Sequence, residues 1–348
     1  MALAVGAKAD NIFAIDSVEV EFDGINGMHY GGTLTFPKGK KKSVGAVIVS
    51  GSGAQDRNGM MAGRDVFRQI AHHLSEHGIA VLRVDDRGVG KTNGVYSQAT
   101  TKDFADDALA AFRFMQTRKE VNRKKTGLIG HSEGGAAITI AAAECKDVAF
   151  LVSVSGIMTD GLTALIEQNI DIVENTKGLE EFDKKRYHEI NDLMFHKVYE
   201  LAEADSTTLN KALWDLYDEW KVKDDARVKA KGIEFDHFRF PIYSYAITAT
   251  SPWYRFFVRH NPAVYAEKVR CPVLAINGTK DVMVRCESNL NSVKRIFTNS
   301  KSVTTHAIEG INHILLPCER GTQDEYRSIK EPIPAEIFDT IWKWILAQ

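Results

Sequence analysis

The feature that most constrains the fold of this chain is a serine set among glycines, in the run GHSEGG at residues 130–135. An apolar run at 126–129 precedes it, and an alanine-rich segment at 136–143 follows it. This order predicts a strand, a sharp turn and a helix, with Ser132 exposed at the apex of the turn. Only small residues fit where strand and helix close on each other, and the glycines of the run meet that need. An ordinary glycine-rich turn between a strand and a helix is the alternative interpretation.

Strands and helices alternate on both sides of a long helical stretch. Apolar or β-branched runs predict strands at 17–22, 33–36, 44–49, 79–84, 127–130, 148–154, 272–276 and 302–308, and helical spacing predicts helices at 65–77, 103–117, 288–296 and 335–346. Between 156 and 252 there is no clear strand, and apolar residues keep helical spacing among many charges. We therefore predict an α/β fold with a mostly parallel, doubly wound sheet, formed by residues 1–156 and 253–348. Residues 157–252 are predicted to form a helical cap inserted into that core.

Two loops beyond predicted strands contain the partners that a reactive serine needs. Acyl transfer by serine requires a histidine to take and return the proton, and a carboxylate to orient the imidazole. In a parallel sheet these groups should lie just past the carboxyl ends of strands, where the loops converge. Asp281 and His313 each follow such a strand, so we predict a triad of Ser132, Asp281 and His313. Asp86 is the rival acid, although the adjacent Arg87 offers it a structural ion pair.

A glycine-rich loop after the third predicted strand, SGSGAQDR at residues 50–57, is expected to face the serine. A tetrahedral intermediate needs two backbone donors, one from the residue after the nucleophile and one from this loop. We predict the N–H groups of Glu133 and Ser52 in these roles, with Gly53 or Ala54 as the alternative to Ser52. Gly53 and Gln55 are also predicted to contact the substrate. A phosphate-binding loop is excluded because no G-K-[ST] follows at the required spacing.

The bulk composition narrows the classes of function. The chain has 348 residues, 44% of them hydrophobic, and a net charge of −2, which is typical of a soluble globular protein with a large insertion or a second domain. A net charge this close to zero does not indicate a nucleic-acid-binding protein, which is usually strongly basic. No apolar run is long enough to span a bilayer. The first ten residues lack the basic region and long apolar stretch of a complete signal peptide, and the compartment stays open.

The histidines and cysteines of the chain do not form a metal-ligand pattern in the sequence. His73 and His77 lie one helical turn apart, but no carboxylate or cysteine completes a ligand set, so we expect a solvated histidine face. The four cysteines include no C-x-x-C pair and predict neither a zinc site nor a disulfide framework. We therefore expect neither a metal nor a cofactor.

Five segments together resemble the α/β-hydrolase family, and more closely its bacterial serine esterases with a helical cap. They are GSGAQDR at 51–57, RVDDRGVGKT at 83–92, the run around Ser132, NGTKD at 277–281 and GINH at 310–313. The resemblance covers both halves of the predicted core and does not clearly extend over the predicted cap. It implies the fold, the triad and the oxyanion loop, but not the substrate, because this fold hosts esterases, thioesterases, peptidases and acyltransferases. Thr92 occupies a position at which this branch of the family often has serine. This difference does not affect the predicted catalytic residues.

The prediction for function is a cofactor-free serine carboxylesterase (EC 3.1.1) that forms an acyl-enzyme with small-molecule esters. Trp253 and Tyr254, at the exit from the predicted cap, are expected to wall a pocket for an apolar acyl or aryl group. An exopeptidase, a thioesterase or an acyltransferase with the same triad is the nearest alternative. A non-catalytic binding protein on this scaffold and a metal-dependent hydrolase are more distant ones. The sequence predicts neither the oligomeric state nor the physiological substrate.

Overall fold

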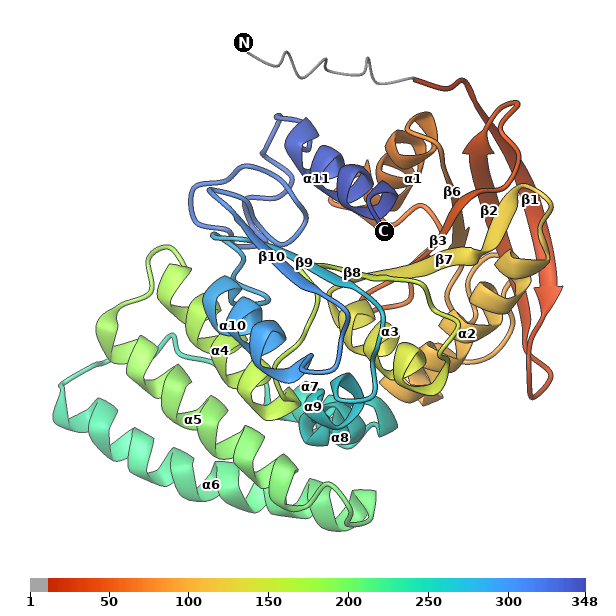
Figure 1. Ribbon diagram of the computed structural model, residues 1–348. Coiled ribbons are helices and arrows are strands. Elements are labelled where there is room, and N and C mark those ends of the chain that lie inside the picture. The colour runs from red at the N-terminus through yellow and green to blue at the C-terminus, as the bar shows by residue number, and fades with distance from the viewer. Residues whose placement is uncertain (1–11) are drawn as a thin grey trace.

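The alternation of strands and helices builds one large sheet with helices on both faces, as the computed structural model of residues 12–348 shows (Figure 1). The strands are β1 (Ile15–Asp23), β2 (His29–Pro37), β3 (Ser43–Val49), β4 (Met60–Met61), β5 (Arg64–Asp65), β6 (Ile79–Val84), β7 (Val121–His131), β8 (Leu151–Val154), β9 (Val273–Gly278) and β10 (Val303–Ile308). The helices are α1 (Val66–Glu76), η1 (Tyr96–Gln98), α2 (Thr101–Thr117), α3 (Glu133–Glu144), α4 (Gly161–Asn175), α5 (Glu181–Glu200), α6 (Ser206–Ala230), α7 (Ile242–Ala249), α8 (Pro252–Arg259), α9 (Ala263–Ala266), α10 (Cys286–Ile296) and α11 (Ala335–Leu346).

The main sheet has eight strands in the order β1-β2-β6-β3-β7-β8-β9-β10. Strands β1 and β2 pair antiparallel with each other, and β2 pairs antiparallel with β6. Every other pair in this sheet is parallel, from β6 through to β10. The predicted fold class, a mostly parallel sheet of the α/β type, is therefore confirmed. The carboxyl ends of β3, β7, β9 and β10 lead into the loops in which the site residues were predicted.

The central strands are apolar along their length because helices cover the sheet on both faces. On one face, α1 and α11 bury residues such as Ile70 and Ile341 against the sheet. On the other face, α2, α3 and α10 bury Phe112, Ile138 and Val293. Figure 1 shows α1 and α11 on the upper side of the sheet and α2, α3 and α10 on the lower side. This double cover explains why the strands read as continuous apolar runs in the sequence.

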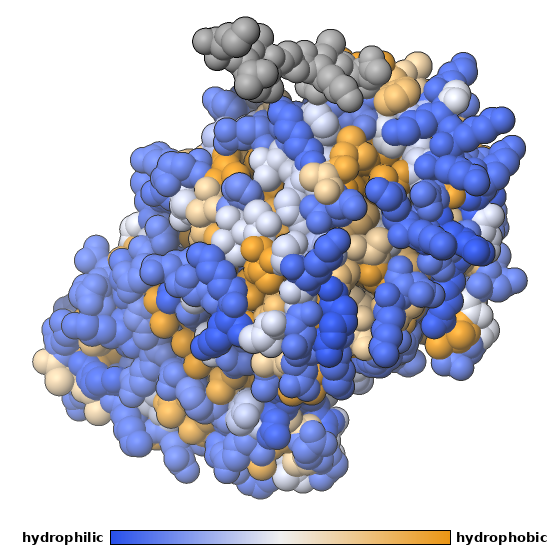
Figure 2. Space-filling view, in the orientation of Figure 1, coloured by the Kyte–Doolittle hydropathy of each residue, from blue (hydrophilic) through white to orange (hydrophobic). Residues whose placement is uncertain are grey.

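Between β8 and β9 the chain leaves the sheet and forms helices α4 to α9. Helices α4, α5 and α6 lie below the sheet in Figure 1, and Figure 2 shows a mainly hydrophilic surface over them. Residues such as Met194 and Leu213 give the helical insertion, which comprises α4 to α7, an apolar core against which the following helix α8 packs. The buried Arg186 places Nη2 2.6 Å from a carboxylate oxygen of Asp224 and 2.6 Å from one of Asp236. The division of the chain into two domains at residues 157 and 252 stays a prediction.

No helix among residues 12–348 combines the length and the apolar character that crossing a bilayer requires.

Candidate active site

Ser132 occupies a strained turn between β7 and α3. Its backbone has φ 56° and ψ −125°, a conformation that residues with a side chain rarely adopt. The turn is so tight that a Cβ on Gly130 would lie 2.3 Å from the Gly134 carbonyl oxygen. A Cβ on Gly134 would lie 2.4 Å from the Val49 carbonyl oxygen, so β3 also presses against the turn. The glycines of the run are thus required by backbone contact, and the serine side chain remains partly exposed.

His313 and Asp281 meet at the carboxyl ends of β9 and β10. The His313 Nδ1 lies 3.0 and 3.1 Å from the two carboxylate oxygens of Asp281. Both residues are buried, with 8% and 4% of their surface exposed. The Asp281 carboxylate also accepts hydrogen bonds from the backbone N–H groups of Met283 and Val284, each at 2.9 Å. The backbone of its own turn therefore fixes the Asp281 carboxylate, and this carboxylate orients the His313 imidazole through Nδ1.

The loop that carries His313 is bound to the residue before the serine. His131 Nε2 donates a hydrogen bond to the His313 carbonyl oxygen at 3.0 Å, and the two rings are 4.8 Å apart. Burial lowers the pKa of His131 to about 4, so its imidazole stays neutral near pH 7. Within residues 12–348, Ser132 Oγ and the His313 ring form no hydrogen bond with each other. In unliganded sites such catalytic contacts are often long and tighten only with substrate.

The loop at residues 50–55 lies directly against Ser132. A Cβ on Gly51 would lie 2.6 Å from the Ser132 Cβ and 3.2 Å from its Oγ. The backbone N–H of Gly53 donates to the Tyr96 hydroxyl at 2.7 Å, which removes Gly53 as a free donor. Among the described residues, the backbone N–H groups of Ser52 and Glu133 donate to no other backbone or side-chain group. Both predicted oxyanion donors are thus available, and their role stays a prediction.

Asp86 binds this loop and does not contact His313. Its carboxylate accepts hydrogen bonds from the Ser50 hydroxyl at 2.5 Å and from the Gln55 backbone N–H at 2.8 Å. The suggested ion pair with Arg87 is wrong, because that guanidinium binds Asp107 with Nε 2.7 Å from Oδ2. Burial raises the pKa of Asp86 to about 7. Asp86 therefore anchors both ends of the loop instead of orienting a histidine.

The side chain of Glu133 is a feature that sequence reasoning missed. From the sequence, Glu133 is expected to act only through its backbone N–H. In the structure its carboxylate is buried and accepts three hydrogen bonds, from Ser52, Thr101 and Trp253. The sequence offers one sign of this role, namely an acidic residue placed between a buried strand and an apolar helix, where a charged side chain needs hydrogen-bond partners. The donors could not be found from the sequence, since they come from three separate segments of the chain.

The predicted substrate contacts occupy different surroundings. Trp253 is partly exposed and reaches the site through its bond to Glu133. Tyr254 is buried, with its hydroxyl 3.4 Å from that of Tyr245 in the helical insertion. Gly53 is exposed on the loop, while Gln55 is half-buried there. A substrate contact stays a prediction for each of these residues.

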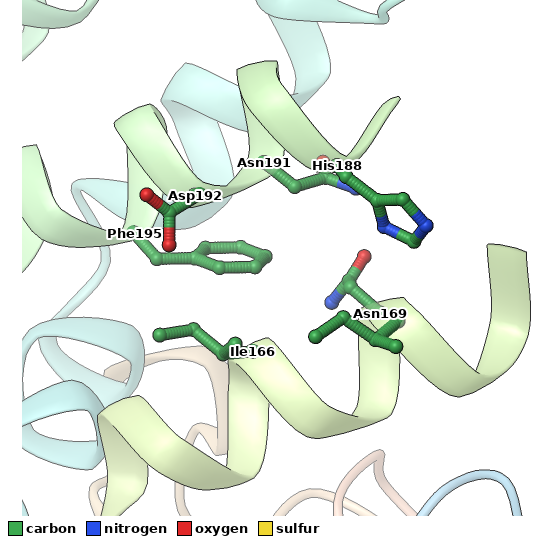
Figure 3. A pocket seen from close by; sticks show the side chains of 7 residues that line it. Ile166, Asn169, His188, Asn191, Asp192 and Phe195 are labelled. Atoms are coloured by element: carbon green, nitrogen blue, oxygen red, sulfur yellow. The ribbon is translucent and has the colours of Figure 1, made fainter. Parts of the chain in front are cut away.

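A separate cavity of about 350 Å³ lies between α4 and α5. Figure 3 shows Phe195 of α5 opposite Ile166 of α4, with His188 and Asn169 at the other end. The lining residues include neither Ser132 nor any residue of the loops that carry Asp281 and His313. We therefore assign no catalytic role to this cavity.

The expectation that no carboxylate accompanies His73 and His77 is wrong. Asp339 of α11 lies beside them, with Oδ1 3.7 Å from His73 Nε2, and the three side chains could share one ion. However, Trp342 Nε1 and Lys343 Nζ each lie 3.0 Å from an oxygen of Asp339. Because both carboxylate oxygens already have donors, one of them a cation, we assign no metal to this cluster.

Solved structures of other proteins share the fold of this chain. The α/β hydrolase GrgF from Penicillium sp. sh18 superposes with a TM-score of 0.52 at 19% identity, over 86% of this chain and 91% of GrgF. The chain has the α/β-hydrolase fold. Est1E from Butyrivibrio proteoclasticus, another structure with this fold, gives a TM-score of 0.54 at 17% identity, over 94% of this chain and 98% of Est1E. The α/β-hydrolase fold that the sequence resemblance implies is therefore confirmed.

Two sequence comparisons match this chain to hydrolases. A family model described as serine aminopeptidase S33 matches residues 57–175, which include the serine turn. Esterase EstD of Thermotoga maritima is 25% identical over 323 residues, covering 92% of this chain. The match spans 66% of EstD, so the chain corresponds to part of that esterase's length.

Proposed function

We propose that this protein is a serine hydrolase that cleaves carboxylic esters. The observation that carries the proposal is the buried His313–Asp281 pair at the same sheet edge as a serine with φ 56°. A strained turn is costly to maintain, and such turns concentrate at functional sites. The similarity to EstD favours an ester as the substrate class.

The proposed reaction proceeds through an acyl-enzyme. Ser132 Oγ attacks the ester carbonyl while His313 Nε2 removes its proton, and Asp281 holds the protonated imidazole. The N–H groups of Ser52 and Glu133 bind the oxyanion of the tetrahedral intermediate. His313 then gives its proton to the departing alcohol, and the same imidazole activates a water that releases the acid and restores the serine.

The helical insertion is proposed to act as a cap, with residues 157–252 over a core of 1–156 and 253–348. Trp253 supports this placement, because it belongs to the helix that follows the insertion and bonds to Glu133 beside the serine. We propose that this aromatic side chain contributes to a site for esters with an apolar acyl or aryl group. The partner is thus a small-molecule ester, and no cofactor enters the proposed steps.

Replacement of the serine tests the proposal. Ser132→Ala should lower turnover of a short-chain p-nitrophenyl ester by a factor on the order of a million. Ser75→Ala is a matched control, since Ser75 is a buried serine on α1 that bonds to the Thr35 carbonyl oxygen. The control should retain turnover near that of the parent. Turnover by Ser132→Ala at the parent's rate would exclude the proposed mechanism.

An exopeptidase with the same triad is the second candidate, favoured by the match of residues 57–175 to the serine aminopeptidase model. Thioesterase and acyltransferase activity would use the same groups. A panel of an ester, a thioester and a dipeptide amide separates these classes by their kcat/KM values. Ester turnover far above the other two supports the proposal, whereas the highest kcat/KM for the amide would favour the exopeptidase.

A further inference from the structure

Three segments far apart in the chain donate hydrogen bonds to one buried carboxylate, that of Glu133, which is 1% exposed. Its Oε2 accepts from Ser52 Oγ at 2.7 Å. Its Oε1 accepts from Thr101 Oγ1 at 2.6 Å and from Trp253 Nε1 at 2.8 Å. Ser52 lies in the loop after β3, Thr101 begins α2, and Trp253 belongs to α8, which follows the helical insertion. The carboxylate therefore joins the proposed oxyanion loop to the base of the insertion.

The chemistry of these donors explains why a carboxylate stands here. Burial raises the pKa of Glu133, and the hydrogen bonds from Thr101, Ser52 and Trp253 oppose that rise. The indole N–H of Trp253 can only donate, so it requires an acceptor at this place. A carboxylate in the first turn of α3 also meets the positive end of the helix dipole. Three uncharged hydrogen-bond donors and the N-terminus of α3 thus stabilise the buried Glu133 carboxylate.

The other hydrogen bonds of the loop go to residues of the core. Asp86 binds both ends of the loop, and Tyr96 accepts the N–H of Gly53. The bond from Ser52 to Glu133 differs, because the same carboxylate also binds Trp253 of α8. A displacement of α8 can therefore shift Ser52, in the middle of the loop, because both Trp253 and Ser52 bind the Glu133 carboxylate.

We propose that Glu133 is a positioning residue whose carboxylate couples the placement of α8 to that of the Ser52 amide. This inference rests on the proposed function, since the Ser52 amide affects the rate only as an oxyanion donor. A displaced donor stabilises the transition state less while ground-state binding changes little, so the coupling should affect kcat more than KM. The helical insertion would thereby influence the rate without touching the reacting atoms.

Removal of one indole N–H tests this coupling. Trp253→Phe keeps a ring to stack on Phe257, whose centroid lies 5.4 Å away. We expect kcat for a short-chain p-nitrophenyl ester to fall about tenfold, with KM within about twofold of the parent. In the control Trp344→Phe, the variant loses a 3.1 Å bond to Thr304 on the opposite face of the sheet and should keep both parameters. Equal effects of the two variants on kcat would overturn the proposal.

A double-mutant cycle tests whether the effect passes through the carboxylate. Ser52→Ala keeps the backbone amide and removes the hydroxyl. Because Ser52→Ala and Trp253→Phe break the same link, their combined effect on kcat should be well below the product of the separate effects. Glu133→Leu should lower kcat about tenfold or more, whereas Glu133→Gln should keep most of it, because its amide can accept from Trp253 and donate to Ser52. Independent effects in the cycle, or equal loss in both Glu133 variants, would overturn the proposal.

Hydrogen exchange of the loop gives a readout that needs no ester turnover. Amides within residues 50–57 should exchange faster in Trp253→Phe than in the parent, with no change in Trp344→Phe. Unchanged exchange of this loop in both variants would overturn the coupling even in a fully active enzyme. A parent without Ser132-dependent ester turnover would contradict the proposed function, while the exchange data would still decide whether Glu133 couples α8 to the loop.

Discussion

Replacement of Asp86 by asparagine should change how the stability of the fold depends on pH. Burial raises the pKa of Asp86 from 3.8 to about 7. Its partners are the Ser50 hydroxyl and the Gln55 backbone N–H. Asparagine can keep both contacts, because its oxygen accepts from Gln55 and its amide group donates to Ser50. Asp86→Asn therefore removes the titrating group while the loop keeps its hydrogen bonds.

The pKa shift of Asp86 determines the sign and size of the effect. Between its unfolded and folded pKa values, the folded protein binds more protons than the unfolded one, so the free energy of unfolding falls as pH rises. A shift from 3.8 to about 7 corresponds to a total loss on the order of 4 kcal/mol, at about 1.4 kcal/mol per unit. About 2–3 kcal/mol of this loss falls between about pH 5 and about pH 8.

Urea unfolding of the parent and Asp86→Asn at these two pH values measures this difference. The stability of the variant relative to the parent should rise by about 2–3 kcal/mol from the lower to the higher pH. Asp225→Asn, at an exposed carboxylate on α6, is the control and should show the same difference at both pH values. If the difference in free energy of unfolding between Asp86→Asn and the parent is the same at both pH values to within about 0.5 kcal/mol, the raised pKa of the Asp86 carboxyl is refuted.

Three further substitutions test other parts of the structure. Arg186→Met removes the nearer cation from the buried carboxylate of Asp224 and leaves it only Arg227, whose Nη2 lies 3.4 Å away. The free energy of unfolding in urea should fall by about 3–5 kcal/mol, and a loss below about 1 kcal/mol would contradict this account. Gly130→Ala places a Cβ 2.3 Å from the Gly134 carbonyl oxygen, so the Tm should fall by several degrees in a thermal scan. An unchanged Tm would contradict the close backbone contact in this turn. His313→Gln should lower kcat on p-nitrophenyl esters at least about a thousandfold with an unchanged circular dichroism spectrum, and parental turnover would exclude this histidine from the mechanism.

Features that depend on local pattern or on sheet geometry could be predicted from the sequence. The turn at Ser132 follows from the adjacent glycines, which leave no room for a side chain. Asp281 and His313 could be named as partners because a parallel sheet gathers the loops that follow its strands. Their mutual contact agrees with that reasoning, since the His313 Nδ1 lies 3.0 Å from a carboxylate oxygen.

Long-range side-chain contacts could not be predicted in the same way. The three donors to Glu133 come from separate segments whose meeting depends on how α8 and α2 pack beside the turn. The placement of Asp339 beside His73 depends on the packing of α11 against α1. Neither sequence spacing nor residue type records such packing. The partners of Asp86 were misjudged for the same reason, because the adjacent arginine turns to Asp107 instead.

Mass spectrometry of the protein treated with a fluorophosphonate tests the central claim most directly. An activated serine forms a stable adduct with this reagent, and peptide mapping identifies the modified residue. We predict one adduct per chain, located on Ser132, with loss of labelling in His313→Gln and normal labelling in Ser75→Ala. An unlabelled parent protein, or an adduct on a different residue, would contradict a nucleophilic Ser132.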